Sequence, residues 1–346
     1  MARRAAASAR PGRATRNHHP ATRRPAQPSK GAGKGAAGAP RIPREQNDVT
    51  LAVAGREVRL TNLGKVFWPD LGVTKGDLLQ YYADVAPVLL PHLHDRAMVM
   101  KRYPNGAYGD FFFMKRAPTP RPPWIETCAI EHASGNVIQF PVIQDVAALL
   151  WVVNLGCIDL NQWYATCDDV DRPDSLHFDL DPTDGGTFAQ ILEAALVVRE
   201  ALGDLGMPSH AKTTGSRGIH VYVPIRRGPT QHEVWELARR LSEAVVQRHP
   251  TLLTAVYAKA RRPKRRVLVD YNQNAWGRTL ASVYSVRPRP HAPVSMPVTW
   301  REVEQGFAIE DFRMDNALRR IRKLGDLWLP LLAPRSRVDL APLIDR

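Results

Sequence analysis

The sequence lacks long apolar runs and has few cysteines. No stretch of about 18 consecutive apolar residues and no signal-peptide core occur in its 346 residues, so a membrane or secreted protein is not expected. The three cysteines, Cys128, Cys157 and Cys167, are odd in number and show no Cys-x-x-Cys spacing. We therefore expect buried or idle thiols in a reducing compartment.

Aromatic and acidic residues are almost missing from the beginning of the chain. Residues 1–46 contain no aromatic residue, 11 Lys or Arg and one acid, Glu45, so they carry +10 of the total charge of +14. A segment with so little to bury cannot offset its ordering entropy, and we expect a disordered basic tail. Three roles stay open: attachment to DNA phosphates, a solvated arm without specific role, and a transit peptide, against which its six prolines argue.

Strand and helix patterns begin after the tail. Alternation predicts a hairpin from Val49 to Leu60, and a capping box formed by Thr74 and Asp77 opens a helix that Pro87 and Pro91 are expected to kink or end. The mixture of strands and amphipathic helices indicates an α/β or α+β fold. Further strands are predicted at 175–180, 209–212, 219–225 and 267–271, and further helices at 146–155, 187–205 and 232–248.

Two features of this first part are compatible with nucleic acid. Lys75 falls in the first helical turn beside backbone N–H groups that are expected to be free, where a phosphate would satisfy both; an exposed lysine is the alternative. Three adjacent aromatic residues, 111–113, cannot all face one core in a strand, so at least one is expected to point outward. Near Lys101 and Arg102 it would stack on a base, and burial on both faces of a central strand is the alternative.

Three carboxylates form the most informative pattern. In the strand that ends at Asp181, alternation places Leu176, Phe178 and Leu180 in a core and puts Asp179 and Asp181 on the other face. Two adjacent carboxylates repel each other unless a cation lies between them, and oxygen ligands suit Mg²⁺ or Mn²⁺. Asp270 on a later strand supplies a third acid, as a two-metal nucleotidyl-transfer centre requires.

A glycine-rich turn lies between these acids in the sequence. Thr214, Ser216, Arg217 and the N–H groups of the turn supply donors within a few residues, as a triphosphate requires. His220 is either a phosphate donor or a core histidine. Arg287 is a further phosphate candidate, and the basic run 261–266 is either a DNA clamp or a solvated loop.

These motifs together resemble a known family. His-Phe-Asp179-Leu-Asp181-Pro, Lys212-Thr-Thr-Gly-Ser-Arg-Gly-Ile-His220 and Val-Leu-Val-Asp270-Tyr-Asn-Gln-Asn resemble the polymerase domain of bacterial ligase D, of the archaeo-eukaryotic primase superfamily, from about Leu60 to Trp300. The resemblance implies mixed sheets flanked by helices, with an N-terminal subdomain at about 47–150 and an RRM-like catalytic subdomain at about 151–330, within one primase-polymerase domain over 47–346.

The resemblance also implies a role for each site residue. It implies that Asp179, Asp181 and Asp270 bind two divalent ions, Mn²⁺ or Mg²⁺, and act in catalysis. It places Thr214, Ser216, Arg217, His220 and Arg287 at the nucleotide, Lys65 and Lys75 at the 5′-phosphate of a DNA end, and Phe112 and Phe113 at the template. Asn161 stands where some members have a histidine near the sugar 2′-hydroxyl, which leaves ribonucleotide preference open.

The implied activity is template-dependent addition of nucleotides at short gaps and aligned broken ends during non-homologous end joining. DNA with a 5′-phosphate, NTP or dNTP, a Ku-like protein and a separate ligase would be its partners in a bacterial, nucleoid-associated cytoplasmic setting. No Lys-x-Asp-Gly adenylation motif occurs, so a stand-alone polymerase is expected. A primase, and a DNA-end-binding protein with a degenerate site, remain alternatives.

Overall fold

The structure is a computed structural model that describes residues 39–344. Most of the expected tail lies outside these residues, but 39–46 are described. Ile42 is buried, its N–H donates to Gln80 Oε1 at 2.8 Å, and Gln80 Nε2 donates to the Pro40 carbonyl at 3.3 Å. The packed part of the chain therefore starts before residue 47, because Ile42 joins the hydrophobic core.

The predicted hairpin at the beginning of the folded part is confirmed. Strand β1 (Val49–Val53) pairs antiparallel with β2 (Arg56–Leu60). Ala54 and Gly55 both have positive φ, 50° and 75°, as a two-residue turn of type I′ requires. A second, short pair, β3 (Val66–Trp68) with β4 (Val73–Thr74), leads into the first helix.

Helix α1 (Lys75–Leu93) begins as predicted and ends later than predicted. Thr74 Oγ1 accepts the N–H of Asp77 at 3.2 Å, while Asp77 Oδ2 accepts the N–H of Thr74 at 2.9 Å, which confirms the capping box. The expectation that Pro87 and Pro91 kink or end the helix was wrong about its end, since it continues to Leu93. Burial of its apolar face, including Leu89 and Leu93, outweighs the missing N–H donors of the prolines.

A three-stranded sheet and a separate hairpin accompany α1. The sheet has the order β6-β5-β9, and α2, which starts at the cap Asp145, packs against α1. Strand β9 pairs with β5 although it lies past residue 150, so the first sheet takes a strand from the later part of the chain. The elements are β5 (Met98–Arg102), β6 (Phe112–Met114), β7 (Thr127–Glu131), β8 (Val137–Pro141), α2 (Val146–Asn154) and β9 (Cys157–Gln162).

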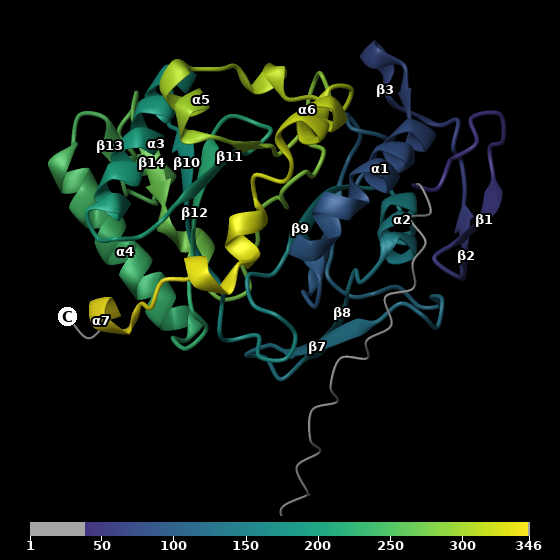
Figure 1. The fold of residues 1–346 in the computed structure, drawn as a ribbon, viewed down its shortest axis with the longest axis horizontal. Helices are drawn as coiled ribbons and strands as arrows, with labels where there is room; N and C mark the ends of the chain where they lie inside the picture. Colours follow the sequence, from purple (N-terminus) through teal and green to yellow (C-terminus); the bar gives the residue numbers. More distant parts are fainter. Residues whose placement is uncertain (1–38, 345–346) are drawn as a thin grey trace, which may run out of the picture. The chain divides into compact units, whose positions relative to one another are not determined.

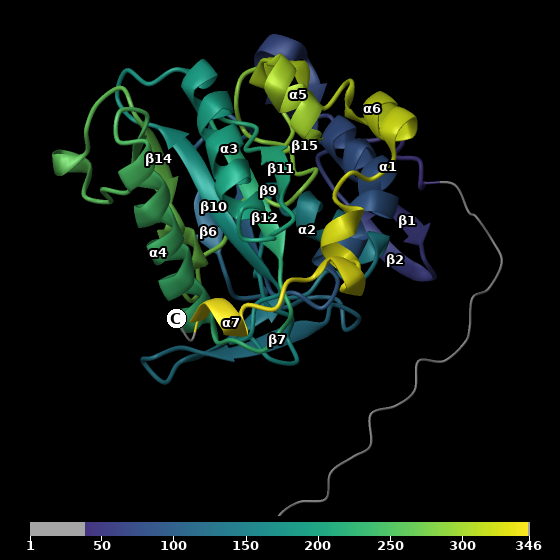
Figure 2. The ribbon, with the colours of Figure 1, turned by 60° about the vertical axis from the view of Figure 1, so that its left-hand side comes forward.

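A six-stranded mixed sheet of order β13-β14-β10-β12-β11-β15 forms the second layer, with α3 and α4 on one face (Figures 1 and 2). Phe178 of β10 and Val269 of β14 point at Leu202 of α3 and Leu241 of α4. Residues 177, 179 and 181 therefore face away from these helices. The bounds are β10 (Ser175–Pro182), α3 (Phe188–Gly203), β11 (His210–Thr213), β12 (Ile219–Pro224), α4 (Gln231–Arg248), β13 (Leu253–Thr254), β14 (Val267–Asp270) and β15 (Pro297–Val298).

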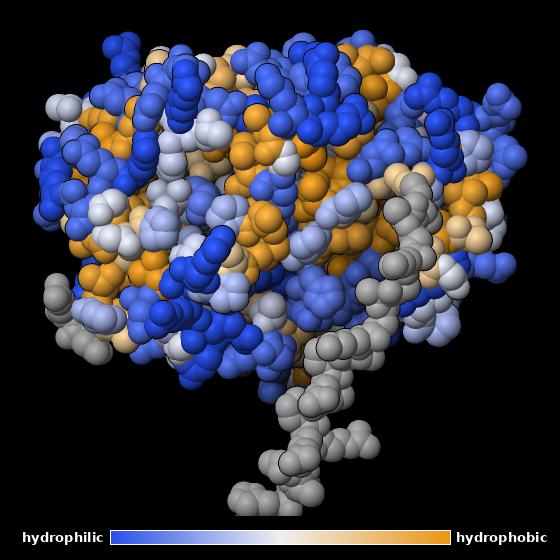
Figure 3. Space-filling view, viewed as in Figure 1, coloured by the Kyte–Doolittle hydropathy of each residue, from blue (hydrophilic) through white to orange (hydrophobic). Residues whose placement is uncertain are grey.

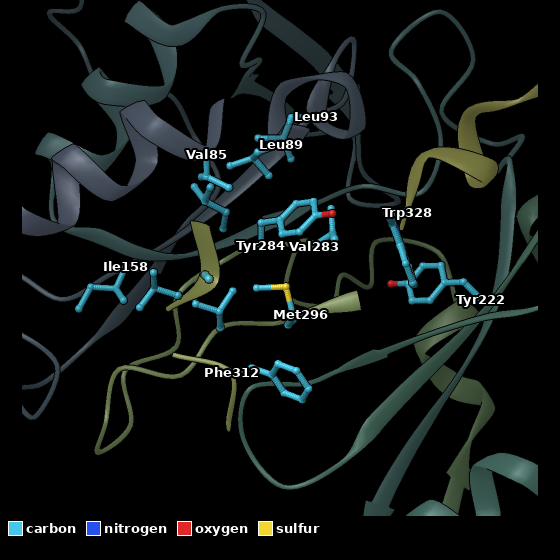
Figure 4. Close-up of a cluster of buried hydrophobic side chains, with 14 of the residues drawn as sticks. Val85, Leu89, Leu93, Ile158, Tyr222, Val283, Tyr284, Met296, Phe312 and Trp328 are labelled. Atoms are coloured by element: carbon cyan, nitrogen blue, oxygen red, sulfur yellow. The ribbon is translucent and has the colours of Figure 1, made fainter. Parts of the chain in front are cut away.

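The segment between β14 and β15 links the two sheets. Val283, Tyr284 and Met296 share a buried cluster with Leu89 of α1 and Ile158 of β9 (Figure 4), and the Tyr81 hydroxyl donates to the Tyr284 carbonyl at 2.8 Å. Three short helices follow: α5 (Trp300–Gln305), α6 (Ala317–Leu324) and α7 (Ala341–Ile344).

The surface carries its polar groups unevenly. Hydrophilic side chains gather over α6 in the view of Figure 3, and this helix contributes Arg319, Arg322 and Lys323. Within residues 39–344, none of the helices combines the length and the apolarity that crossing a bilayer would require.

Candidate nucleotidyl-transfer site

Strand register aligns four polar residues in one row across the six-stranded sheet. Asp270 of β14 lies opposite Asp179 of β10, Asp179 lies opposite His220 of β12, and His220 lies opposite Lys212 of β11. Directly opposite residues of paired strands share a face, and this is the face that α3 and α4 leave free. The fold thus brings together Asp179, Asp270 and His220, as the sequence predicted, and adds Lys212.

The three acids carry unfavourable electrostatics in the absence of a cation. Burial, and then the charge of Asp270, raise the pKa of Asp179 to about 7; the charge of Asp179, and then burial, raise the pKa of Asp181 to about 7. Burial also raises the pKa of Asp270, whose oxygens accept from the Asn272 N–H at 2.9 Å and Gln273 Nε2 at 3.0 Å. Buried, mutually repelling carboxylates of this kind fit a cation.

The donor set suits a hard divalent ion that is completed by its substrate. Asp179 Oδ1 is buried and accepts no well-formed hydrogen bond from the described residues. No group of three His, Cys, Asp or Glu side chains in residues 39–344 converges tightly enough to enclose an ion alone. Mg²⁺ and Mn²⁺ commonly take one or two carboxylates together with substrate phosphates, so the acids fit such ions as part of a ternary site.

The glycine-rich turn is built differently from the expectation. The N–H groups of Ser216, Arg217 and Gly218 all donate to Thr214 Oγ1, at 3.1, 3.2 and 3.1 Å. The prediction that these N–H groups are free for a triphosphate was therefore wrong. The hydroxyl of Thr214 shapes the turn and retains its own proton for a ligand.

Two glycines make this turn possible. Gly215 has a φ of 62°, which side-chain-bearing residues rarely adopt, and a Cβ on it would lie 2.6 Å from Arg287 Cγ. A Cβ on Gly218 would lie only 2.0 Å from the Leu180 carbonyl oxygen. The turn therefore rests directly on the end of β10, and the positive charge of Arg217 offsets part of the rise in the pKa of the Asp181 carboxyl.

His220 is tied to the protein on both ring nitrogens. Its Nδ1 lies 2.7 Å from Lys212 Nζ, and its Nε2 lies 3.2 Å from Asp179 Oδ1. Burial, and next the charge of Lys212, hold the pKa of the imidazole well below its usual value, so the ring is neutral. His220 is therefore a buried histidine with a partner at each ring nitrogen that also lines the cavity, and its role as a phosphate donor stays a prediction.

The wall facing the acids contains a residue to which sequence reasoning gave no role. Asp159 of β9 is buried, with Oδ2 3.3 Å from Arg287 Nε and 3.8 Å from Lys101 Nζ. Arg287 also donates from Nη1 to the Thr214 carbonyl at 2.7 Å. The burial of this acid is explained by the two cations that it pairs with. Only its alternation with Asn161 on one strand could have indicated it.

A cavity of about 470 Å³ opens between these walls. Asn161 lines it, with Nδ2 donating to the Asp159 carbonyl at 3.0 Å. Gln273 and Arg278, which the sequence analysis did not select, line it as well. Of the predicted residues, the cavity contains Asn161, Asp179, Asp181, Thr214, Ser216, Arg217, His220, Arg287 and Phe113.

The aromatic run is exposed rather than buried on both faces. Phe112 and Phe113 have exposed fractions of 44% and 58% on β6, the edge strand of its sheet, so the burial alternative was wrong. Phe113 lines the cavity, while Phe112 lies under the Arg102 guanidinium, 5.1 Å from ring centroid to Cζ. Lys101 Nζ lies 4.1 Å from the Phe111 ring centroid. The two template candidates therefore face opposite sides of one strand.

Lys65 and Lys75 lie close together but outside the cavity. The Lys75 N–H donates to the Lys65 carbonyl at 2.8 Å, and the Gly76 N–H donates to the Leu63 carbonyl at 2.9 Å. The expectation of free N–H groups at the start of α1 was therefore wrong, because β3 and the segment before it cover them. Lys75 is buried, donates to the Thr61 carbonyl at 2.6 Å and has its pKa lowered to about 8 by burial.

The basic run before β14 is partly folded back on the protein. Arg262 donates to the Val256 and Tyr257 carbonyls, at 3.0 and 2.7 Å, and Arg266 donates to the Pro250 carbonyl at 3.1 Å. Arg262 and Arg266 are half-buried, whereas Arg261, Lys264 and Arg265 are exposed, so both the clamp and the solvated loop remain open for this segment.

Comparison with known proteins agrees with this geometry. The family model described as LigD, primase-polymerase domain, matches residues 74–328. The chain belongs to this family. It is a nucleotidyltransferase by family. The match begins after Lys65, so it does not extend to the first of the two lysines.

Relatives in the LigD primase-polymerase family share the sequence and the fold. The multifunctional non-homologous end joining protein LigD of Mycolicibacterium smegmatis is 35% identical over 82% of this chain and 37% of that protein. The bifunctional LigD of Bacillus subtilis is 30% identical over 78% of this chain and 43% of that protein. The chain thus spans less than half the length of these relatives.

A solved structure gives the same picture. The polymerase domain of Mycobacterium tuberculosis ligase D in complex with DNA has a TM-score of 0.74 and 32% identity, with 79% of this chain and 97% of that chain covered. The predicted fold, mixed sheets flanked by helices, is confirmed.

Proposed function

We propose that this chain is a template-dependent DNA and RNA polymerase that fills short gaps and extends aligned DNA ends in non-homologous end joining. The observation that carries the proposal is the cross-strand row of Asp270, Asp179 and His220, in which Asp179 and His220 line one cavity together with the cations Arg287 and Lys101. Acids on one wall and cations on the other suit a nucleotide triphosphate bound with divalent ions.

The chain's own side chains supply binding and orientation. Thr214, Ser216, Arg217 and Arg287 hold phosphate oxygens, and His220 donates from the same wall. Asp179, Asp181 and Asp270 would hold two ions, Mn²⁺ or Mg²⁺, which when bound activate the primer 3′-hydroxyl and neutralise the leaving pyrophosphate. The cavity walls fix the nucleotide between these groups, so much of the rate enhancement comes from orientation.

Groups outside the phosphate site would select the DNA and the sugar. Lys65 and Lys75 bind the 5′-phosphate of a gapped or broken end, and Phe112 and Phe113 contact the template. Asn161, which lines the cavity, would contact the sugar. A Ku-like protein and a separate ligase would act with it in the bacterial cytoplasm. The N-terminal and catalytic subdomains, about 47–150 and 151–330, would share the substrate between them.

One assay tests the proposal. A gapped duplex with a 5′-phosphate is extended with Mn²⁺ and labelled dNTP or rNTP, by the wild type, by Asp179→Asn and by Asp184→Asn, an exposed acid beyond β10. We expect extension by the wild type and Asp184→Asn, and a loss of about 1,000-fold or more for Asp179→Asn, because each 1.4 kcal/mol of lost ion binding costs tenfold.

The alternatives give different results in the same assay. Tight binding of the end without extension by the wild type would identify an end-binding protein, and synthesis on unprimed single strands would identify a primase. The ratio of rNTP to dNTP incorporation reports what Asn161 does to sugar choice.

A further inference from the structure

Lys212 is a lysine buried where the proposed chemistry assigns it no contact with substrate. Its exposed fraction is 1%, and Nζ has three hydrogen-bond partners: it donates to the Ala281 carbonyl at 2.9 Å and to Ser295 Oγ at 2.7 Å, and it lies 2.7 Å from His220 Nδ1. Ser295 Oγ in turn donates to the Thr213 carbonyl at 2.9 Å, so it accepts from Lys212. Burial, and next the charge of Arg287, lower the pKa of Lys212 well below its usual value. An ammonium can donate to all three partners at once, so the geometry favours the charged form against this burial.

The hydrogen bonds decide which nitrogen of His220 carries the proton. If Lys212 donates to Nδ1, then Nε2 bears the hydrogen and faces Asp179 Oδ1 at 3.2 Å. In the opposite tautomer, Nδ1–H would donate to a neutral amine. The bare Nε2 lone pair would then face an ionised carboxylate oxygen. That arrangement is repulsive whenever Asp179 is ionised, as an ion-binding carboxylate must be.

Burying a lysine for packing alone would be costly. An aliphatic side chain of similar length would fill the same volume without desolvating a charge, and replacing buried ions by apolar residues is often neutral or stabilising. The strand register places the Lys212 charge at the end of the row of site residues. This row runs over four adjacent strands and consists of Lys212, His220, Asp179 and Asp270. The imidazole lies between a cation and the acids.

We propose that Lys212 is a positioning residue that fixes His220 as a neutral Nε2–H donor aimed at the nucleotide site. The ammonium holds Nδ1 as an acceptor, so the donor of His220 always points toward Asp179 and the cavity. Lys212 acts through His220 and does not itself touch substrate. The expected effect on KM rests on the proposed polymerase function, whereas the expected tautomer of His220 does not depend on it.

The tautomer is measured directly in the full-length, metal-free chain. Long-range ¹H–¹⁵N correlation spectra of ¹⁵N-histidine protein at pH 8 identify the protonated nitrogen, and the His220→Gln spectrum assigns the signal. We expect the Nε2–H tautomer in the wild type and in Lys323→Met, an exposed control lysine on α6, and a shift toward Nδ1–H in Lys212→Met. An Nδ1–H tautomer in the wild type would overturn the proposal even if Lys212→Met does not fold.

A double-mutant cycle separates positioning from a purely structural role. With gapped duplex and Mn²⁺, we expect Lys212→Met to raise the KM for the nucleotide about tenfold, because a charge-assisted hydrogen bond is lost, while thermal unfolding confirms a folded protein. In a His220→Ala background the same substitution should change KM less than twofold. If the fold-changes in KM caused by the two substitutions multiply in the double variant, Lys212 does not act through His220. If the wild type does not extend the gapped duplex, the polymerase proposal fails. The tautomer measurement then still tests whether Lys212 positions His220.

Discussion

At the scale of single residues, Asp159 orients the side chains of two cations in the site, Arg287 and Lys101. Arg287 and Lys101 both lie within 4 Å of its buried carboxylate, and its Oδ1 has no hydrogen-bond partner among the described residues. The negative charge of Asp159 offsets part of the positive charge that phosphate oxygens would meet as they approach Lys101 and Arg287. The residue is therefore a counter-ion for Arg287 and Lys101.

We predict that Asp159→Asn destabilises the protein in a way that a triphosphate repairs. Without the carboxylate, two partly buried cations lose their partner, and the free energy of unfolding should fall by about 1–3 kcal/mol because the cavity still admits water. Thermal unfolding with and without inorganic triphosphate measures this, with Asp110→Asn, an exposed acid, as control. Equal losses with and without triphosphate would contradict the prediction.

Thr214 offers a second test at this scale, because its hydroxyl accepts three backbone N–H groups. Thr214→Val keeps the shape and leaves those donors unpaired, so we expect a loss of about 1–3 kcal/mol in stability and at least about tenfold in extension rate. Thr214→Ser keeps the oxygen and should behave like the wild type. Hydrogen exchange of the amides of 216–218 reports the turn; unchanged exchange in the valine variant would exclude this role.

At the scale of elements, alternation and capping placed most strands and helices correctly. The hairpin 49–60, the start of α1 and the strand that carries Asp179 follow from local pattern alone. Asp159 and Lys212 could not be found this way, because Arg287, which pairs with Asp159, and Ser295, which pairs with Lys212, lie 128 and 83 residues further along the chain in a segment without periodicity. The prediction of free N–H groups at the start of α1 and in the glycine-rich turn was wrong. These groups donate hydrogen bonds to backbone carbonyls at α1 and to the Thr214 hydroxyl in the turn.

The start of α1 gives a pH-dependent prediction. Burial lowers the pKa of Lys75 to about 8, below its ordinary 10.5, so the folded state releases this proton before the unfolded state does. Stability from this group therefore rises with pH between about 8 and 10.5, and below 8 the full cost of burying the charge is present. Lys75→Met should be more stable than the wild type at pH 7, with the difference shrinking toward pH 10.

Urea unfolding across this pH range measures the difference, and DNA binding supplies the control. If Lys75 binds a terminal phosphate, Lys75→Met should weaken binding of ends that carry a 5′-phosphate and leave 5′-hydroxyl ends unaffected. A stability difference that stays constant from pH 7 to 10 would show that the buried charge is not its cause.

At the scale of the whole molecule, the site depends on segments from both sheets. Asp159 and Lys101 come from the β6-β5-β9 sheet, and the acid row comes from the six-stranded sheet. The segment with Arg287 and Ser295 joins them through hydrogen bonds to Thr214 and Lys212. Residues 39–344 accordingly belong to one compact unit, in which neither sheet alone completes the cavity.

The charge of the N-terminal residues 1–38 leads to a prediction about the salt dependence of DNA binding. They contain nine Lys or Arg and no acid, out of a net charge of +14, while the cavity has its own cations. Binding to duplex DNA weakens with salt by about 0.9 logarithmic units per phosphate contact for each tenfold rise in concentration. Deleting 1–38 should therefore make the salt dependence shallower by two or more contacts and leave kcat at saturating DNA unchanged. Titrations from 50 to 300 mM salt measure the slope, and an unaltered slope would mean that the tail makes no phosphate contacts.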